Sequence, residues 1–270
     1  MSGLGSVFAF TRTEGRAAFV AYLEAGDPSL DRTADLVAAL VSGGADIIEL
    51  GVPFSDPVAD GTVNQRAATR ALSAGVTLSG ILDLVARERD RWGVPIVLFT
   101  YFNPIHARGC ERFAEQAASS GVDGVLCVDL PPEEGRVSLT SKLEARGVDS
   151  IYLLAPTSTK ERMKIVRQAA SGFVYYVSLT GVTGERERLP VGLDKAVRSV
   201  RRSIDLPVAV GFGISAPEQV EAVGSVADGV VVGSALVRIV EEHAGEKDLP
   251  RRLEERVAEL ASPLRVRSRS

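Results

Sequence analysis

Two carboxylic acids stand where an apolar run ends and a loop begins, and their types and spacing suit acid–base chemistry. Glu49 lies inside the nearly all-apolar run 46–51, and Asp60 lies in the loop that follows it. Burying a carboxylate without a partner is costly, so the presence of Glu49 needs a reason. Two separated carboxylates suit the removal of a proton at one point of a substrate and its delivery at another. The simpler alternatives are an ion pair or a surface position for Glu49, and a solvated loop acid or a helix N-cap for Asp60.

Glycines that follow the later apolar runs form a second group of candidates. They lie in the loop 179–186, which contains Thr183 and Gly184, in the segment 211–215, which contains Gly213, and at Gly233. Glycines let backbone amides approach an anion, and a serine such as Ser234 at the start of a helix adds a hydroxyl and the positive end of the helix dipole. The pattern predicts a phosphate site, although Gly-x-Gly alone is also common in turns.

Aromatic residues recur near the ends of the apolar runs. These residues are Tyr22, Phe99, Tyr101, Tyr175 and Phe212. They line a flat apolar slot for an aromatic ring if they meet at one mouth, and they belong to the ordinary core if they do not.

Eight apolar, β-branched runs alternate with amphipathic stretches, and these are the elements that must position the candidates. The predicted strands are 17–23, 46–51, 94–101, 124–129, 150–154, 173–178, 207–212 and 229–233. The predicted helices between them are 29–42, 65–73, 78–92, 111–119, 133–145, 160–170 and 193–204, and a last helix is apolar at Leu249, Leu253, Val257 and Leu260. The pattern predicts an α/β fold, a single (β/α)8 TIM barrel over residues 1–270, with a short N-terminal helix, extra loop helices and a frayed tail at 263–270. In such a barrel the site lies at the C-terminal ends of the strands.

Composition narrows the function classes. The 270 residues are 45% hydrophobic and 24% charged, and the net charge of −4 provides no basic field for nucleic acid. The apolar runs have strand length and no export signal is visible, so a cytoplasmic location is expected. Cys110 and Cys127 are too few for a disulfide framework, and His106 and His243 lack partners at ligand spacing, so no metal site is expected.

The segment from Glu49 to Gly61, ELGVPFSDPVADG, resembles the active-site segment of the tryptophan synthase alpha chain family. The resemblance extends over about residues 19–242. It includes YFNP at 101–104, DLPPEE at 129–134, LAPTS at 154–158, GVTG at 181–184, GFGIS at 211–215 and GSA at 233–235.

The resemblance implies a β/α barrel that cleaves indole-3-glycerol phosphate into indole and glyceraldehyde 3-phosphate, in the last stage of tryptophan biosynthesis, with no cofactor in this chain. Glu49 would be the general acid/base at the indole C3 and the side-chain hydroxyl, and Asp60 would stabilise charge at the indole N–H. Tyr175 would help to position the substrate, and Thr183 would belong to a lid. Gly184, Gly213, Gly233 and Ser234 would hold the phosphate, and Tyr22, Phe99, Tyr101, Leu126, Leu153 and Phe212 would wall the ring.

The resemblance also implies a partner, a pyridoxal-phosphate-dependent beta chain in an alpha2beta2 heterotetramer. The beta chain would dock on the face that holds Pro53, Asp56 and Asn103 and receive indole through a tunnel. Three alternatives remain open: a stand-alone lyase of the same chemistry, a related phosphate-binding barrel such as an isomerase or the indole-glycerol phosphate synthase, and a catalytically weak binding subunit that activates the beta chain.

The sequence departs from the family pattern near the site. Thr62 stands where proline is usual, Asn64 where an aliphatic residue is usual, and Glu24 where threonine is common. Ala21 and the pair Cys127-Val128 also replace usual residues. These departures are expected to alter loop rigidity and the environment of Asp60 more than the reaction.

Overall fold

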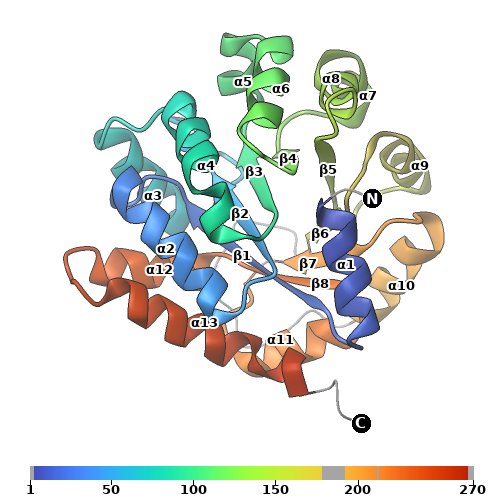
Figure 1. Cartoon of the computed structure of the whole chain (residues 1–270). Coiled ribbons are helices and arrows are strands. Elements are labelled where there is room, and N and C mark those ends of the chain that lie inside the picture. Colours follow the sequence, from blue (N-terminus) through green and yellow to red (C-terminus); the bar gives the residue numbers. More distant parts are fainter. Residues whose placement is uncertain (1–2, 178–191, 212, 267–270) are drawn as a thin grey trace.

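Eight parallel strands pair in chain order and close into a barrel, with β1 beside β8 (Figure 1). The structure is a computed structural model that describes residues 3–177, 192–211 and 213–266. The strands are β1 Ala18–Glu24, β2 Ile47–Gly51, β3 Ile96–Thr100, β4 Gly124–Cys127, β5 Asp149–Leu154, β6 Val174–Val177, β7 Val208–Gly211 and β8 Gly229–Val232. This topology confirms the predicted TIM barrel, and each predicted strand is present to within two residues at either end.

Helices surround the barrel on its outside (Figure 1). They are α1 Gly3–Thr13, α2 Leu30–Gly43, α3 Thr62–Ser73, α4 Leu78–Trp92, α5 Phe102–Arg108, α6 Cys110–Ser119, α7 Pro132–Gly135, the π-helix η1 Arg136–Thr140, α8 Ser141–Glu144, α9 Lys160–Ala169, α10 Leu193–Ser203, α11 Pro217–Gly224, α12 Ser234–His243 and α13 Leu249–Val266. In the described residues no single helix is long and apolar enough to cross a membrane, and α3 with α4 reaches that length only as a pair bent by 92°.

The strands have apolar residues on both faces because each strand packs on two cores. Ala18 and Val20 of β1 face the barrel interior, whereas Phe19, Ala21 and Leu23 pack against the outer helices. This is why the strands read as nearly continuous apolar runs. Helix α1 closes the N-terminal end of the interior, where the rings of Phe8 and Phe173 lie 5.5 Å apart.

The prediction that the chain frays from Pro263 was wrong for residues 263–266, which continue α13. Proline at 263 removes one helical N–H, but the hydroxyl of Ser262 donates to the Glu259 carbonyl at 2.8 Å and so satisfies that carbonyl. Leu264 is buried, and Arg265 donates to the carbonyl of Gly43 at 3.0 Å. These tertiary contacts offset the weak helix propensity of the segment.

The single helix predicted over 133–145 is three short pieces, α7, η1 and α8. The π-helical turn adjoins Tyr152 of β5, whose hydroxyl lies 2.7 Å from Thr140 Oγ1 and leaves no room for a Cβ at Gly135. The irregular backbone thus lies where this segment packs closely against a buried strand residue.

Candidate active site

Glu49 lies on β2 with its side chain in the barrel mouth, opposite Tyr22 of β1 in the strand register. It is 1% exposed, and its Oε1 has no hydrogen-bond partner among the residues that the structure describes. No arginine, lysine or histidine of that part of the chain forms an ion pair with it, so the ion-pair alternative gains no support. Burial raises the pKa of Glu49 to about 8, so the carboxyl is largely protonated at neutral pH.

Asp60 occupies the loop between β2 and α3 and is also buried. The hydroxyl of Tyr101 donates to Asp60 Oδ2 at 2.8 Å and accepts from the Ala59 amide at 3.0 Å. Burial raises the pKa of Asp60, and hydrogen bonds from Tyr101 and Asn64 oppose that shift. The N-cap of α3 is Gly61, which rules out the alternative that Asp60 is the helix N-cap.

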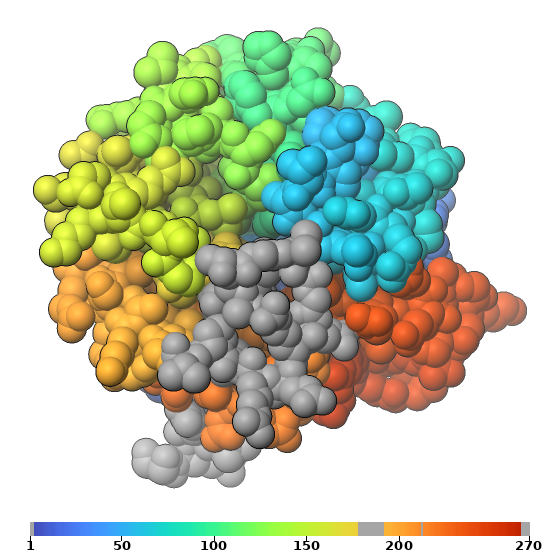
Figure 2. Space-filling view, turned by 180° about the vertical axis from the view of Figure 1, so that it is seen from behind, coloured from blue at the N-terminus to red at the C-terminus, as the bar shows by residue number. Residues whose placement is uncertain are grey.

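One cavity brings most of the predicted site residues together. Its lining among the described residues is Tyr22, Glu49, Ala59, Asp60, Asn64, Phe99, Tyr175, Gly213, Val231, Gly233 and Ser234. Thr183, Gly184 and Phe212 lie outside the described residues. Figure 2 shows the face of the molecule that is turned away from the viewer in Figure 1. On this face the colours run around the molecule from light blue through green and yellow to orange and red. Segments far apart in the sequence, from the light blue to the red part of the chain, therefore contribute to this face.

The remaining predicted wall residues lie beside the cavity rather than on it. Tyr101 is buried and reaches the site through its bond to Asp60. Leu126 and Leu153 belong to the barrel interior, where they are the strand-register neighbours of Phe99 and Tyr175. They therefore lie beside the two rings, on the neighbouring strands.

The aromatic wall has a defined geometry. The rings of Tyr22 and Phe99 meet edge to face, with centroids 5.4 Å apart and an interplanar angle of 81°. Tyr175 is buried, and burial raises its pKa well above 10, with smaller contributions from the charges of Glu49 and Asp60. The phenol therefore stays protonated and acts as a neutral group beside the two carboxyls.

A further part of the cavity lining consists of two glycines and the start of a helix. Gly233 is the N-cap of α12, and Ser234 is the first residue of that helix. Gly213 follows β7 with φ +71°, a left-handed conformation that favours glycine. No lysine or arginine is among the described lining residues, so an anion here would be held by amides, the Ser234 hydroxyl and the helix dipole.

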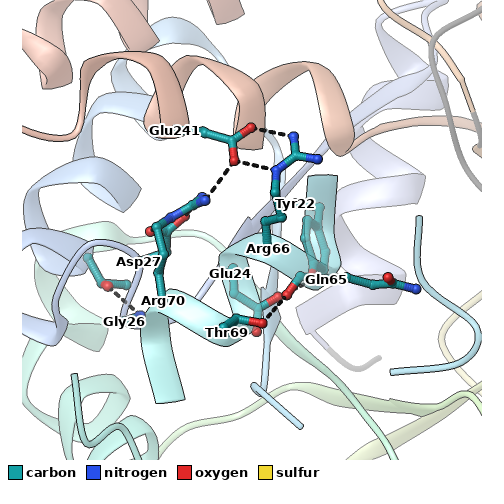
Figure 3. A network of polar contacts seen from close by, with 10 residues as sticks. Tyr22, Glu24, Gly26, Asp27, Gln65, Arg66, Thr69, Arg70 and Glu241 are labelled. Carbon is teal, nitrogen blue, oxygen red and sulfur yellow. Dashed lines mark hydrogen bonds and ion pairs between the residues drawn. The ribbon is translucent and has the colours of Figure 1, made fainter. Parts of the chain in front are cut away.

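A polar network fixes α3, the helix that follows Asp60 (Figure 3). Arg70 of α3 donates to both oxygens of Asp27 after β1, at 2.8 and 2.7 Å, and to Glu241 of α12 at 2.7 Å. Arg66 also binds Glu241, and bonds from Arg66 and Arg70 lower the pKa of Glu241 to about 2. The network joins the helix after Asp60 to the loop after β1 and to α12, and β1 and α12 each carry a residue of the cavity lining.

Sequence reasoning did not assign Asn64 or Glu24 to the site, although both were noted as departures from a family pattern. Asn64 lines the cavity, and its Oδ1 is buried without a partner among the described residues. Glu24 is 3% exposed and accepts a hydrogen bond from the Tyr22 hydroxyl. Strand alternation could have found Glu24, since residues 22 and 24 of a strand share a face.

Titratable side chains gathered at the C-terminal mouth of a closed parallel barrel are typical of β/α-barrel enzymes, and the fold and this cavity assign the chain to that class. A family model described as Tryptophan synthase alpha chain matches residues 8–265. The chain therefore belongs to the tryptophan synthase alpha chain family, which confirms the resemblance of its sequence motifs.

Individual relatives agree with this assignment. The chain is 48% identical over 260 residues to the tryptophan synthase alpha chain of Solibacter usitatus, covering 96% of this chain and 97% of that protein. It is 51% identical over 241 residues to that of Geobacter sulfurreducens, covering 89% and 91%. Among solved structures, tryptophan synthase of Mycobacterium tuberculosis superposes with a TM-score of 0.89 at 39% identity, covering 98% of each chain. The alpha subunit of Legionella pneumophila gives 0.90 at 36% identity, with the same coverage.

Proposed function

We propose that this chain is a carbon–carbon lyase that cleaves indole-3-glycerol phosphate into indole and glyceraldehyde 3-phosphate, with Glu49 moving the proton. Family membership supports the reaction. The observation that carries the role of Glu49 is its buried Oε1, which has no partner among the described residues and lies in the same cavity as Asp60. A buried carboxyl oxygen left without a partner calls for an explanation, and a substrate atom supplies one.

The cleavage needs a net proton transfer from the substrate hydroxyl to the indole C3. The bond between C3 and the carbinol carbon breaks with its electron pair moving to the indole, while the hydroxyl loses its proton as the aldehyde forms. A protonated Glu49 donates to C3, then accepts the hydroxyl proton and regains its starting state. Its pKa of about 8 keeps it ready to donate at neutral pH.

Asp60 has a different task in this proposal. An anionic carboxylate near the indole N–H stabilises the positive charge that develops on the ring after C3 is protonated. Tyr101 and Asn64 donate to Asp60 and oppose the effect of burial on its pKa, so they favour the charged form. Asn64, where the family pattern has an aliphatic residue, thus supports rather than weakens this role.

The rest of the cavity fits the remainder of the substrate. Tyr22, Phe99 and Tyr175 offer a wall for the indole ring, while Gly213, Gly233 and Ser234 offer an end for the phosphate. We extend the phosphate site to Gly184, the lid to Thr183 and the ring wall to Phe212 by resemblance alone. The reaction as written needs no cofactor in this chain.

Gly233→Ala tests the phosphate end. A Cβ at this position would make only ordinary contacts with Tyr22, the nearest at 3.5 Å. A phosphate seated on the start of α12 would collide with that methyl group. We expect KM to rise about tenfold, a loss of about 1.4 kcal/mol, and the Tm without ligand reports any effect of the change on folding. Gly213→Ala is a poor substitute because its φ of +71° adds strain with or without ligand. Native KM for Gly233→Ala would place the phosphate elsewhere.

A beta chain is the proposed partner, in an alpha2beta2 assembly whose beta chains carry pyridoxal phosphate and receive the indole, in the cytoplasm. The matching solved structures include tryptophan synthase of Mycobacterium tuberculosis. On the proposed face Asp56 and Asn103 are exposed, and Val58 beside Asp56 is 82% exposed. Pro53 is buried, so it would shape the loop rather than contact the partner.

Asp56→Lys tests this face. Charges at the rim of an interface affect docking more than chemistry, so the change should weaken beta-chain association at least about tenfold and leave cleavage by the isolated chain within about twofold. Titration calorimetry with a beta chain and an indole-release assay measure the two quantities. Equal loss of both would place Asp56 inside the catalytic site.

The catalytically weak binding subunit is the second candidate function. Glu49 and Asp60 share one cavity, and this argues for a working catalyst. Mixing the chain with indole-3-glycerol phosphate, with and without a beta chain, distinguishes the lyase from the binding subunit. The lyase releases indole in both mixtures, whereas a binding subunit changes only the reaction of the beta chain.

A further inference from the structure

Tyr22, Glu24 and Gly51 interlock at the edge of the ring wall. The Tyr22 hydroxyl donates to Glu24 Oε2 at 2.5 Å, and both side chains are buried. Gly51 pairs with Glu24 in the strand register, and a Cβ there would lie 2.3 Å from the Tyr22 hydroxyl and 2.6 Å from Glu24 Oε2. Glycine at 51 therefore makes room for the pair.

The pair turns the polar end of Tyr22 away from the cavity. The Tyr22 ring lines the cavity, whereas neither Glu24 nor Gly51 is among its described lining residues. The ring carbons of Tyr22 meet Phe99 edge to face, and Val63, Ala67 and Val237 pack around them. The cavity thus receives ring surface, and the hydroxyl is bound behind it.

We propose that Glu24 is a positioning residue for the aromatic slot: it holds the Tyr22 hydroxyl behind the wall so that Tyr22 presents only its ring to the indole. The inference rests on the proposed function, because it assumes an aromatic ring in this slot. Without an acceptor at 24, the buried hydroxyl is left unpaired, which costs about 1–3 kcal/mol. The ring then turns to find a partner among the polar groups of the cavity, and the slot loses its shape.

The surroundings of Glu24 indicate that its side chain serves to bind the Tyr22 hydroxyl. Besides Tyr22, the charged groups that act on Glu24 are Asp60, Asp27 and Arg70, and Arg70 is bound to Asp27 and Glu241 (Figure 3). Glu24 Oε1 has no partner among the described residues. Burial raises the pKa of Glu24 to about 8, so it is largely a neutral acid at pH 7, and its observed side-chain bond is the one to the Tyr22 hydroxyl.

The test compares two ligands on the full chain and four variants, Glu24→Gln, Glu24→Leu, Tyr22→Phe and the double variant Tyr22→Phe/Glu24→Leu. The probes are 3-(indol-3-yl)propyl phosphate, which fills the slot and the phosphate end, and glycerol phosphate, which has no ring. Calorimetry gives the affinity of each, independently of catalysis.

We expect Glu24→Leu to weaken the indolyl probe about tenfold, with glycerol phosphate changed less than about twofold. Glu24→Gln keeps an acceptor and should bind both probes as the native chain does. Tyr22→Phe removes the group that needs holding, so adding Glu24→Leu to it should cost less than about twofold. If Glu24→Leu does not fold, Glu24→Thr takes its place, because a threonine side chain is too short to reach the hydroxyl.

An equal loss from Glu24→Leu in the native and Tyr22→Phe backgrounds would overturn the proposal, because Glu24 would then not act through Tyr22. An equal loss of both probes would also overturn it by showing a general structural effect. If the native chain binds the indolyl probe but does not cleave the substrate, the proposed function fails, and the binding cycle still decides the role of Glu24.

Discussion

Glu49→Gln lowers kcat for indole release about 10²–10⁴-fold and leaves the melting temperature unchanged or higher. The first effect is the usual contribution of a positioned general acid/base. Glutamine keeps the volume of the side chain but cannot carry the proton from the hydroxyl to C3. The second effect follows from the environment, because Glu49 is 1% exposed and its Oε1 has no partner among the described residues. Replacing it with a neutral amide removes no ion pair observed in the structure.

Glu24→Gln is the matched control for this experiment. Glu24 is also a buried glutamate at the C-terminal end of the barrel, and its pKa is likewise raised to about 8 by burial. It does not line the described cavity, so its amide variant should keep kcat within about twofold. Both variants should still bind the indolyl probe. Native turnover of Glu49→Gln, or a large loss of stability that ligand does not restore, would identify Glu49 as a structural residue.

The free energy of unfolding falls as pH rises from about 4.5 to above 8, and these two buried carboxyls cause much of the fall. Burial raises the folded-state pKa of Glu24 and of Glu49 from 4.5 to about 8. Between these pH values the folded state binds more protons than the unfolded state. The stabilising contribution of the two carboxyls is therefore fully present below pH 4.5 and is lost as the pH rises through 8. At about 1.36 kcal/mol per pKa unit, the loss is on the order of 5 kcal/mol for each group.

Urea denaturation at several pH values between 5 and 9 measures this loss. Glu24→Gln and Glu49→Gln should each flatten the curve, and the double variant should flatten it most. Glu241 has the opposite sign, because its pKa is lowered to about 2 by bonds from Arg66 and Arg70, and its contribution disappears only as pH falls below about 4.5. Identical curves for the native chain and the double variant would show that neither carboxyl is buried in solution.

The barrel was predictable because its signal is local and repeated. Each strand is apolar on both faces, so even the short β4 and β8 stand out, and eight such units separated by helices favour closure. Helix α5 was missed because it has only the seven residues Phe102–Arg108, with proline in its first turn. The end of α13 was misjudged because Leu264 and Arg265 are fixed by distant segments rather than by local propensity.

The site was predictable where the chemistry lies at strand ends. Glu49, Asp60, Tyr175 and Gly233 were expected there, and all four line the cavity. The bond from Tyr101 to Asp60 was not predictable, because it joins residues 41 positions apart. The Tyr22–Glu24 pair is a local, same-face contact on a strand. The role that we propose for this pair could not be predicted from the sequence, because it depends on where Gly51 and the cavity lie in the folded chain.

The dependence of kcat/KM on pH tests the central claim most directly, since the claim is that Glu49 begins the reaction protonated. With indole-3-glycerol phosphate as substrate, kcat/KM should be level near neutral pH and fall about tenfold per unit above a pKa near 8. The phosphate of the substrate titrates near pH 6, outside this window. Glu24→Gln should show the same fall of kcat/KM at alkaline pH. This result would exclude Glu24, the other carboxyl whose pKa is raised, as the cause of the fall. A profile that rises through pH 8, or stays flat to pH 9, would contradict Glu49 as the proton donor.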